Sequence, residues 1–212
     1  MKLKVCGMRF SENIEEVARL NPDFMGFIFY PKSKRFVRMD EMKDSLAKLN
    51  QSISKVGVFV NQPFQEVLET CKFLHLEFAQ LHGNEPLEYA QRLKENGIGI
   101  IKVFHITNDF NWEETEKFTS VSDFFLFDTA TPEHGGSGKK FDWQQLSNYA
   151  GTTPFLLSGG IGVDDADEIL KLNHPAFAGI DVNSKFETES GAKDVLLLKQ
   201  FLTTISFHTQ TK

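Results

Sequence analysis

The feature that most constrains the fold is an alternation, repeated eight times along the chain, of short apolar runs with amphipathic stretches. The runs suit buried strands, and the amphipathic stretches have the apolar spacing of helices. Strands buried on both faces read as nearly continuous apolar runs, and crossover helices make them parallel. Eight such pairs in 212 residues predict an α/β protein, a single (β/α)₈ TIM barrel of small size. An open doubly wound sheet is the alternative, but no G-x-G-x-x-G motif follows the first run.

The runs and stretches set the expected element boundaries. The candidate strands are Leu3–Cys6, Met25–Phe29, Lys55–Val60, Phe78–Leu81, Ile100–Phe104, Phe124–Phe127, Phe155–Leu157 and Ala178–Val182. The candidate helices are Ser11–Leu20, Asp40–Leu49, Gln62–Leu74, Pro86–Asn96, Asn111–Phe118, Asp142–Tyr149, Asp164–Leu172 and Ala192–Ile205. The expected N-caps are Ser11, Asp40, Asp142 and Asp164, and Pro86 suits a first helical position. We expect one domain over residues 1–206 and a polar tail over 207–212.

Composition excludes several functional classes. A net charge of −6 argues against a general nucleic-acid binder, because affinity for the phosphate backbone comes mainly from clustered Lys and Arg. The two cysteines, Cys6 and Cys71, lie far apart without a metal-ligand pattern, so a disulfide framework or a zinc site is not expected. No apolar run approaches the roughly 20 residues that span a bilayer, and the first residues lack a signal-peptide core. These features favour a soluble cytoplasmic protein with a small-molecule partner, without nucleic acid or membrane.

One carboxylate, Asp128, ends the apolar run Phe124–Phe127 and precedes a glycine-rich stretch at residues 132–139. Aspartate at such a place is commonly a turn residue or a helix cap. This stretch is long and glycine-rich for a simple turn, which favours a functional loop that folds back over the carboxylate. Burial among phenylalanines is expected to raise the pKa of Asp128 and to favour its protonated form.

Catalytic groups of a TIM barrel stand at the carboxyl ends of its strands, and Cys6 ends the first candidate strand. Gly7 follows it and leaves room beside the thiol. The commoner role of such a cysteine is that of a small buried apolar residue, which is how we interpret Cys71. A thiol acts as a base only if nearby positive charge lowers its pKa, and Arg35 and Lys32 are the candidates for that charge.

The loops after the seventh and eighth strands form the usual phosphate site of this barrel. Gly159 and Gly160 follow the seventh candidate strand, where glycine lets backbone N–H groups approach an anion closely. Asn183 and Ser184 follow the eighth and are expected to form the second half of the site at a short extra helix. A flexible turn is the alternative, since a Gly-Gly pair alone is weak evidence.

His82 and Asp181 stand at the ends of the fourth and eighth candidate strands and are candidate substrate-binding residues. The alternative for His82 is a rim or core histidine whose hydrogen bonds are satisfied within the fold. His134 lies in the glycine-rich stretch after Asp128 and suits a solvated loop position. Neither histidine has partners at metal-ligand spacing, so we predict no metal.

Six ordered motifs together resemble phosphoribosylanthranilate isomerase of tryptophan biosynthesis. The motifs are Lys4–Met8, Gly26–Arg35, Val56–Asn61, Gln80–Gly83, Asp128–Thr129 with Gly135–Lys139 and Phe141–Trp143, and Leu157–Ile161. Any one of them is weak evidence, but together they cover the chain end to end at compatible spacing. Lys185 departs from the resemblance, because it stands where the family usually has a glycine.

The resemblance implies a cofactor-free (β/α)₈ barrel that converts N-(5-phosphoribosyl)anthranilate to 1-(2-carboxyphenylamino)-1-deoxyribulose 5-phosphate by an acid–base Amadori rearrangement. In that family Cys6 corresponds to the general base and Asp128 to the general acid. Arg35 corresponds to the residue that meets the anthranilate carboxylate. The family chemistry leaves a monomer or a homodimer open for this chain.

Two other functions remain at this stage. Another phosphosugar isomerase or epimerase on the same barrel would more naturally use paired carboxylates or metal ligands than one cysteine and one aspartate. A noncatalytic phosphosugar-binding protein would keep Gly159 and Gly160 but has no need for both Cys6 and Asp128.

Overall fold

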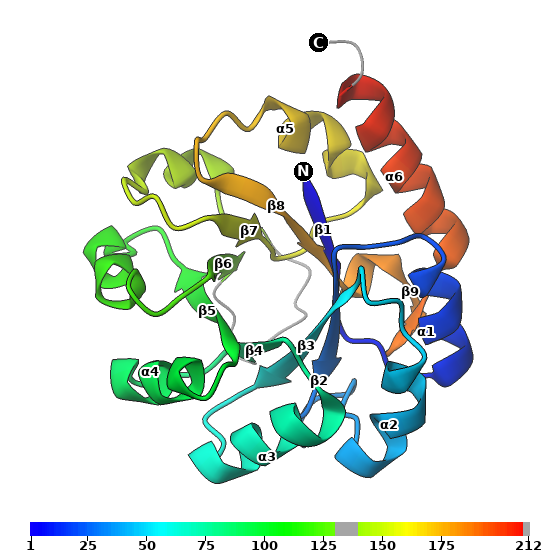
Figure 1. Cartoon of the computed structure of the whole chain (residues 1–212). Coiled ribbons are helices and arrows are strands. Elements are labelled where there is room, and N and C mark those ends of the chain that lie inside the picture. Colours follow the sequence, from blue (N-terminus) through cyan, green and yellow to red (C-terminus); the bar gives the residue numbers. More distant parts are fainter. Residues whose placement is uncertain (130–139, 210–212) are drawn as a thin grey trace.

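The computed structural model describes residues 1–129 and 140–209, with side chains through residue 205, and its centre is a closed barrel (Figure 1). Each strand pairs with the next in chain order, and the eighth pairs with the first, all in parallel. The strands are β1 (Lys2–Val5), β2 (Phe24–Ile28), β3 (Ser54–Phe59), β4 (Phe78–Leu81), β5 (Gly99–Ile106), β6 (Phe124–Thr129), β7 (Phe155–Leu157) and β8 (Phe177–Val182). The predicted (β/α)₈ barrel is confirmed.

Helices surround the barrel between successive strands. The α-helices are α1 (Ser11–Ala18), α2 (Met39–Ala47), α3 (Phe64–Leu74), α4 (Leu87–Glu95), α5 (Ala166–Lys171) and α6 (Val195–Thr209). The 3₁₀ helices are η1 (Trp112–Phe118), η2 (Trp143–Asn148), η3 (Val163–Asp165) and η4 (Ser184–Phe186). The fifth and sixth expected helices are therefore 3₁₀ turns rather than α-helices. Among the described residues, no helix combines the length and the apolar character that a membrane span requires.

The end of the chain differs from the expected boundaries. Ala192–Lys193 forms a strand, β10, that pairs antiparallel with β9 (Glu187–Glu189), so the last helix starts at Val195 rather than at Ala192. Helix α6 continues to Thr209 and so enters the stretch expected as a polar tail. Residues 210–212 lie outside the described part of the chain.

Three of the four expected N-caps, Ser11, Asp40 and Asp164, are wrong. Ser11 is the first residue of α1 and Asp40 the second of α2, because the extended residues Phe10 and Arg38 precede these helices. Asp142 does cap η2, accepting a hydrogen bond from the Gln144 N–H.

The two other expected positions are displaced as well. Asp164 lies inside η3, whose N-cap is Gly162, and the Asp165 carboxylate at the end of η3 accepts a hydrogen bond from the Gly162 N–H at 2.7 Å. Pro86 lies at the N-cap of α4 rather than at the first helical position.

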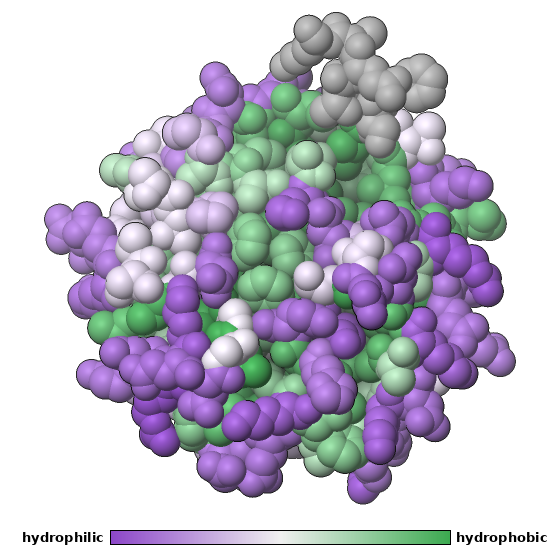
Figure 2. All heavy atoms as spheres, viewed as in Figure 1, coloured by the Kyte–Doolittle hydropathy of each residue, from purple (hydrophilic) through white to green (hydrophobic). Residues whose placement is uncertain are grey.

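The barrel interior divides into two layers. The lower layer is apolar, because Phe24, Phe78 and Phe124, each the first residue of an even-numbered strand, meet edge to face with ring centroids 5.4–6.1 Å apart. The upper layer, toward the carboxyl ends of the strands, holds buried polar side chains, among them Lys4 and Asp181. On the face in Figure 2, hydrophilic residues lie around the rim and hydrophobic ones gather toward the middle. The fold thus places chemistry at one end of the barrel.

Candidate functional site

A buried ion pair occupies the upper barrel interior beneath the strand ends. Parallel pairing of β1 with β8 sets Lys4 beside Asp181, and the Lys4 Nζ lies 2.7 Å from Asp181 Oδ1. Ser158, just after β7, donates its hydroxyl to Asp181 Oδ2 at 3.0 Å. Burial alone would lower the pKa of Lys4, but Asp181 and Cys6 raise it, and the net direction is upward. The lysine is therefore a fixed positive charge inside the barrel.

Cys6 follows β1 and is buried beside this ion pair, with its N–H donating to the Val182 carbonyl at 2.9 Å. Room for the thiol comes from Gly26 on the adjacent strand β2. A Cβ added at Gly26 would lie 2.7 Å from Cys6 Sγ and 3.1 Å from Lys4 Nζ. A side chain at Gly26 would therefore displace both groups.

Burial raises the pKa of the Cys6 thiol above its ordinary value, while Lys4 and Lys193 lower it and Asp181 raises it. The expectation that Lys32 supplies the charge is wrong, because its side chain is exposed. Arg35, the other expected cation, does interact electrostatically with Cys6. For Cys71, burial raises the pKa to about 12, as suits a thiol that packs as an apolar side chain.

Asp128 lies on β6, three strands around the barrel from β1, and faces the same interior. Burial and, to a smaller extent, Asp181 raise the pKa of its carboxyl, whereas the Thr129 N–H and Lys4 lower it, and the net pKa is about 7. The Thr129 N–H donates to Asp128 Oδ1 at 2.8 Å. The expected raised pKa is confirmed, and its cause is the expected desolvation.

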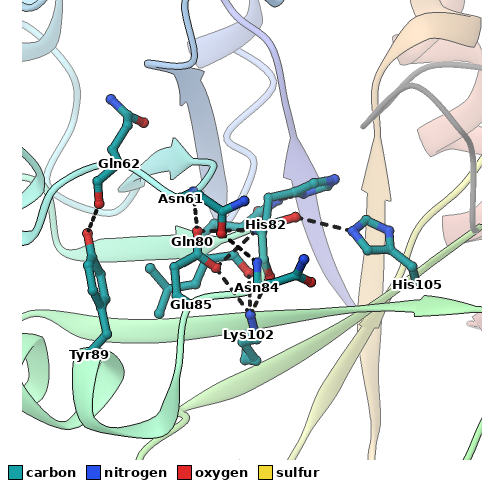
Figure 3. Close-up of polar contacts among 11 residues, drawn as sticks. Asn61, Gln62, Gln80, His82, Asn84, Glu85, Tyr89, Lys102 and His105 are labelled. Atoms are coloured by element: carbon teal, nitrogen blue, oxygen red, sulfur yellow. Dashed lines mark hydrogen bonds and ion pairs between the residues drawn. The ribbon is translucent and has the colours of Figure 1, made fainter.

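Two histidines adjoin Asp128. His82 Nε2 lies 3.6 Å from Asp128 Oδ2, and His82 Nδ1 lies 3.0 Å from the Gln80 amide nitrogen. An amide that donates to Nδ1 leaves the ring proton of a neutral imidazole on Nε2, the nitrogen that faces Asp128. His105 Nε2 lies 3.2 Å from the His82 carbonyl oxygen, as Figure 3 shows.

His82, His105 and Asp128 also have possible metal-ligand atoms that all lie within 4.8 Å of one another. Sequence spacing gives no sign of this group, because His82 follows β4, His105 lies in β5 and Asp128 lies in β6. The absence of a metal stays a prediction.

A second buried ion pair fixes the loop that carries His82 (Figure 3). Lys102 on β5 lies 3.2 Å from Glu85 Oε2 and donates to the Gly83 carbonyl at 2.7 Å. Glu85 in turn accepts from the Gly83 N–H at 3.0 Å and the Asn61 N–H at 2.8 Å. The pair thus joins the ends of β3, β4 and β5 and holds the backbone just after His82.

A third charged group stands over β8. Arg35 donates through Nε and Nη2 to the two oxygens of Glu187 at 2.8 and 2.6 Å. Glu187 also accepts from the Lys193 ammonium at 2.6 Å, and Lys193 donates to Asn183 Oδ1 at 2.7 Å. Glu187 holds two cations, so the group carries a net positive charge.

The loops after β7 and β8 lie next to each other. Gly159 and Gly160 have φ values of +91° and +69°, which glycine adopts without strain. A Cβ at Gly159 would lie 2.3 Å from Thr129 Oγ1, so this loop packs directly on the end of β6. On the β8 side, the Lys185 side chain is exposed, and its Cβ would lie 3.7 Å from a Cβ added at Gly162.

Comparison with known proteins identifies the family. The family model for N-(5'-phosphoribosyl)anthranilate (PRA) isomerase matches residues 3–204. A curated relative of that name from Parabacteroides distasonis is 47% identical over 203 residues, covering 95% of this chain and 92% of the relative. One from Phocaeicola vulgatus is 41% identical, covering 95% and 96%. The chain belongs to the PRA isomerase family.

Solved structures of PRA isomerases share the architecture. The enzyme from Thermotoga maritima is 30% identical with a TM-score of 0.85, and the one from Thermus thermophilus is 26% identical with a TM-score of 0.87. Each comparison covers 97% of this chain and 98% of the other. A further PRA isomerase, 28% identical with a TM-score of 0.84, was solved with reduced 1-(o-carboxyphenylamino)-1-deoxyribulose 5-phosphate, again over 97% and 98% of the two chains. The present chain is accordingly an isomerase of tryptophan biosynthesis.

Most residues predicted for this PRA isomerase stand at one end of the barrel. Cys6, Asp128, His82 and Asp181 line its upper interior, and the loop of Gly159 and Gly160 packs against the strand that carries Asp128. Ser184 begins η4, the expected short extra helix. Asn183 precedes that helix but makes no side-chain cap, because its Oδ1 accepts from Lys193. Residues 130–139, which include His134 and the glycine-rich stretch, lie outside the described residues.

Four further side chains, Lys4, Glu187, Lys193 and His105, belong to the site of this PRA isomerase, and sequence reasoning missed their roles. Lys4 forms part of a quoted motif, but a lysine within an apolar run gives no sign of the side to which it points. Glu187 and Lys193 follow the last barrel strand in a segment expected to be loop and helix. His105 was visible only as a polar residue at a strand end.

Proposed function

We propose that Cys6 is the base and Asp128 the acid with which this isomerase converts N-(5'-phosphoribosyl)anthranilate to 1-(2-carboxyphenylamino)-1-deoxyribulose 5-phosphate. Protonation of the ribose ring oxygen by Asp128 accompanies cleavage of its bond to C1′, and the nitrogen lone pair forms a C1′=N bond. The Cys6 thiolate then removes the proton from C2′, and the electrons of that C–H bond form an enolamine. Tautomerisation gives the ketone, so the sequence is an isomerisation without net oxidation.

The observation that carries this assignment is the buried environment of the Asp128 carboxyl at the end of β6. Its pKa is raised to about 7, so the protonated form that an acid needs is populated at neutral pH. Cys6 stands three strands away around the same interior, so acid and base approach that interior from different sides. Each such group contributes roughly 10² to 10⁴-fold to the rate.

Other residues bind the parts of the substrate that do not react. Backbone N–H groups around Gly159, Gly160, Asn183 and Ser184 hold the phosphate dianion. Arg35 binds the anthranilate carboxylate through Nη1, the guanidinium nitrogen that lies outside its bidentate contact with Glu187.

His82 and Asp181 complete the substrate-binding set. His82 directs Nε2 toward Asp128 and orients the sugar beside the acid. Asp181 bounds the floor of the sugar site from its ion pair with Lys4.

We place the enzyme in the cytoplasm and assign it no cofactor, because the rearrangement moves only protons and electron pairs within the substrate. One solved structure contains monomers generated from the dimeric PRA isomerase of Thermotoga maritima. Sedimentation of the purified protein distinguishes a monomer from a homodimer for this chain.

The test is turnover of the fluorescent substrate by the purified chain and by Cys6→Ser. The wild type should abolish substrate fluorescence, whereas Cys6→Ser should lose at least about 100-fold in kcat, because serine is a far poorer base near neutral pH. Cys71→Ser, which changes a buried thiol remote from the site, is the matched control and should keep its activity. A Cys6→Ser enzyme with a tenth of wild-type kcat would remove Cys6 from the base role.

A further inference from the structure

Lys4 is completely buried inside the barrel, where a lysine is expensive to place. A buried ion pair is weak evidence for stability, because well-packed apolar side chains often serve as well or better. The Lys4–Asp181 pair therefore calls for a reason other than holding the barrel together.

The other buried lysine of the barrel wall, Lys102, shows what a structural role looks like. Its ammonium donates to the Gly83 carbonyl as well as to Glu85, and so ties down a loop. Lys4 instead donates to the carboxylate of Asp181 within the interior. Its remaining surroundings include the thiol of Cys6, which raises the pKa of the lysine together with Asp181, against the lowering effect of burial.

The missing side chain at Gly26 brings the ammonium and the thiol together. One point, the position of an added Cβ, lies 2.7 Å from Cys6 Sγ and 3.1 Å from Lys4 Nζ. At such proximity a cation typically lowers the pKa of an acid by roughly 1–3 units. Strand β2 thus has a glycine at a position where a side chain would push the thiol of Cys6 and the ammonium of Lys4 apart.

We propose that Lys4 is a positioning residue for the reaction, whose ammonium, held in place by Asp181, stabilises the thiolate of Cys6 and so makes it a base. This inference rests on the proposed function, in which Cys6 takes the proton from C2′. Lys4 does not contact the reacting atoms and acts mainly through the thiol, since its lowering effect on the pKa of Asp128 is smaller than the raising effects of burial and Asp181.

Other charges also face Cys6. Asp181 on β8 raises the pKa of the thiol, and Lys193 on β10 lowers it. Arg35, in the loop after β2, interacts with the thiol as well. Lys193 and Arg35 are both held by Glu187, which offsets their charge, and the effect of Lys4 on the pKa of Cys6 exceeds that of Asp181.

The dependence of kcat/KM on pH should reveal the effect of Lys4 on the thiol of Cys6. The rate constant kcat/KM follows the product of protonated Asp128 and ionised Cys6. The pKa of Asp128 is about 7, and that of Cys6 lies above its ordinary value. The product, and with it kcat/KM, is therefore constant at pH values between these two pKa values and falls below the lower one and above the higher one. Loss of Lys4 raises the pKa of Cys6, which lowers the level region and moves the alkaline limb to higher pH.

The decisive experiment titrates the protein labelled with [3-¹³C]cysteine by NMR, since the Cβ shift reports ionisation of each thiol. Cys71, with its pKa raised to about 12, is an internal reference that stays protonated through the range. Lys4→Met should move the Cys6 midpoint upward by roughly 1–3 units, and Asp181→Asn should move it downward. The two variants break the same ion pair, so a merely structural role would move both midpoints in the same direction and would overturn the proposal.

Two further variants guard against misfolding. Lys4→Met/Asp181→Asn removes both charges, leaves no unpaired buried ion, and should still raise the midpoint, because the cation outweighs the carboxylate. Lys102→Met breaks a comparable buried pair and should leave the Cys6 midpoint in place. An unchanged midpoint in the double variant would contradict the proposal.

Steady-state kinetics separate the hypothesis that Lys4 stabilises the thiolate from the hypothesis that Cys6 is the base. In Lys4→Met, kcat/KM should fall at least about tenfold near pH 8, with the alkaline limb displaced and partial recovery in Lys4→Arg. A shifted thiol titration with an unmoved alkaline limb would uphold the effect of Lys4 on the thiol but refute Cys6 as the base. An unshifted titration would refute the role of Lys4 whatever the activity of Cys6→Ser.

Discussion

The lower and upper layers of the barrel interior occupy equivalent inward positions on the same strands, yet they are built from opposite chemistry. Below, Phe24, Phe78 and Phe124 close the barrel with rings that meet edge to face. Above, the charges of Lys4 and Asp181 are buried, with Lys4 0% and Asp181 6% exposed. Burial of the phenylalanine rings in the lower layer stabilises the fold, whereas burial of the charges in the upper layer costs free energy of desolvation.

This difference shows that the apolar side chains that stabilise the barrel and the polar side chains of the candidate site lie at different levels along the barrel axis. The apolar layer stabilises the closed sheet and can thereby offset desolvated charges a few residues further along each strand. Those charges shift the pKa values of Cys6 and Asp128. Mutations in the upper layer should therefore mainly lower activity, whereas mutations in the lower layer should mainly lower stability.

The largest effect on activity is expected for Asp128→Asn in the upper layer. The amide keeps the shape but cannot supply the proton to the ring oxygen, so kcat should fall by roughly 10² to 10⁴-fold or more. Stopped assays of substrate fluorescence with the purified variant measure this loss. Near-normal turnover would remove Asp128 from the mechanism.

The same variant should not be less stable. The folded-state pKa of Asp128, about 7, lies above its ordinary value of 3.8, so the native protein holds this proton more tightly than the unfolded chain does. That contribution to stability is fully present below the unfolded pKa and is lost as pH rises through 7. Asp128→Asn should therefore melt at an equal or higher temperature than the wild type at pH 8, with the difference shrinking toward pH 4.

Phe24→Ala tests the lower layer. Phe24 is buried and contacts both other rings, and its removal leaves a cavity, so the free energy of unfolding should fall by about 3–5 kcal/mol. Denaturant unfolding measures this change, and Phe24→Leu, which keeps most of the volume, should cost far less. The kcat per folded molecule should stay within about twofold. A large loss of kcat in a stable Phe24→Ala protein would show that the layers are not independent.

The fold and the placement of Cys6 and Asp128 at one end of the barrel could be predicted from sequence because both follow from local patterns. Apolar runs give the strands, and the residue after each run must lie at the same end of a parallel barrel. Pairings across the barrel could not be read this way, since Lys4 and Asp181 are 177 residues apart and meet only through the register of β1 with β8. The same holds for Arg35 and Glu187, which are 152 residues apart.

The helix caps failed for a related reason. Ser11 and Asp40 have the right chemistry, but the helices start one or two residues earlier than a cap there would require. Ser11 instead shares a hydrogen bond of 2.7 Å with Ser45 on the neighbouring helix α2. A tertiary contact thus uses a side chain that local rules assign to a cap.

A smaller effect is expected at the rim, for Arg35→Met. Loss of a charge-assisted contact to the anthranilate carboxylate should raise KM by roughly tenfold and change kcat little. Glu187 remains paired with Lys193 at 2.6 Å, so the loop should keep its place. Steady-state kinetics separate the two parameters, and Arg38→Met, which removes an exposed arginine paired with Asp40, is the matched control. An unchanged KM in Arg35→Met would refute the assignment.

The smallest effect is expected for Lys185→Gln, at the position where the family usually has a glycine. The Lys185 side chain is exposed, and backbone N–H groups of the loops after β7 and β8 are sufficient to hold the phosphate in our proposal. KM should therefore stay within about twofold at low salt, and wild type and variant should respond alike to added salt. If the ammonium instead reaches the phosphate, Lys185→Gln should raise KM several-fold at low salt, and the gap should close as salt screens the contact in the wild type. Measuring KM for both proteins at low and high ionic strength decides between these results, and a gap that closes with salt would extend the charged chemistry of the upper layer out to its rim.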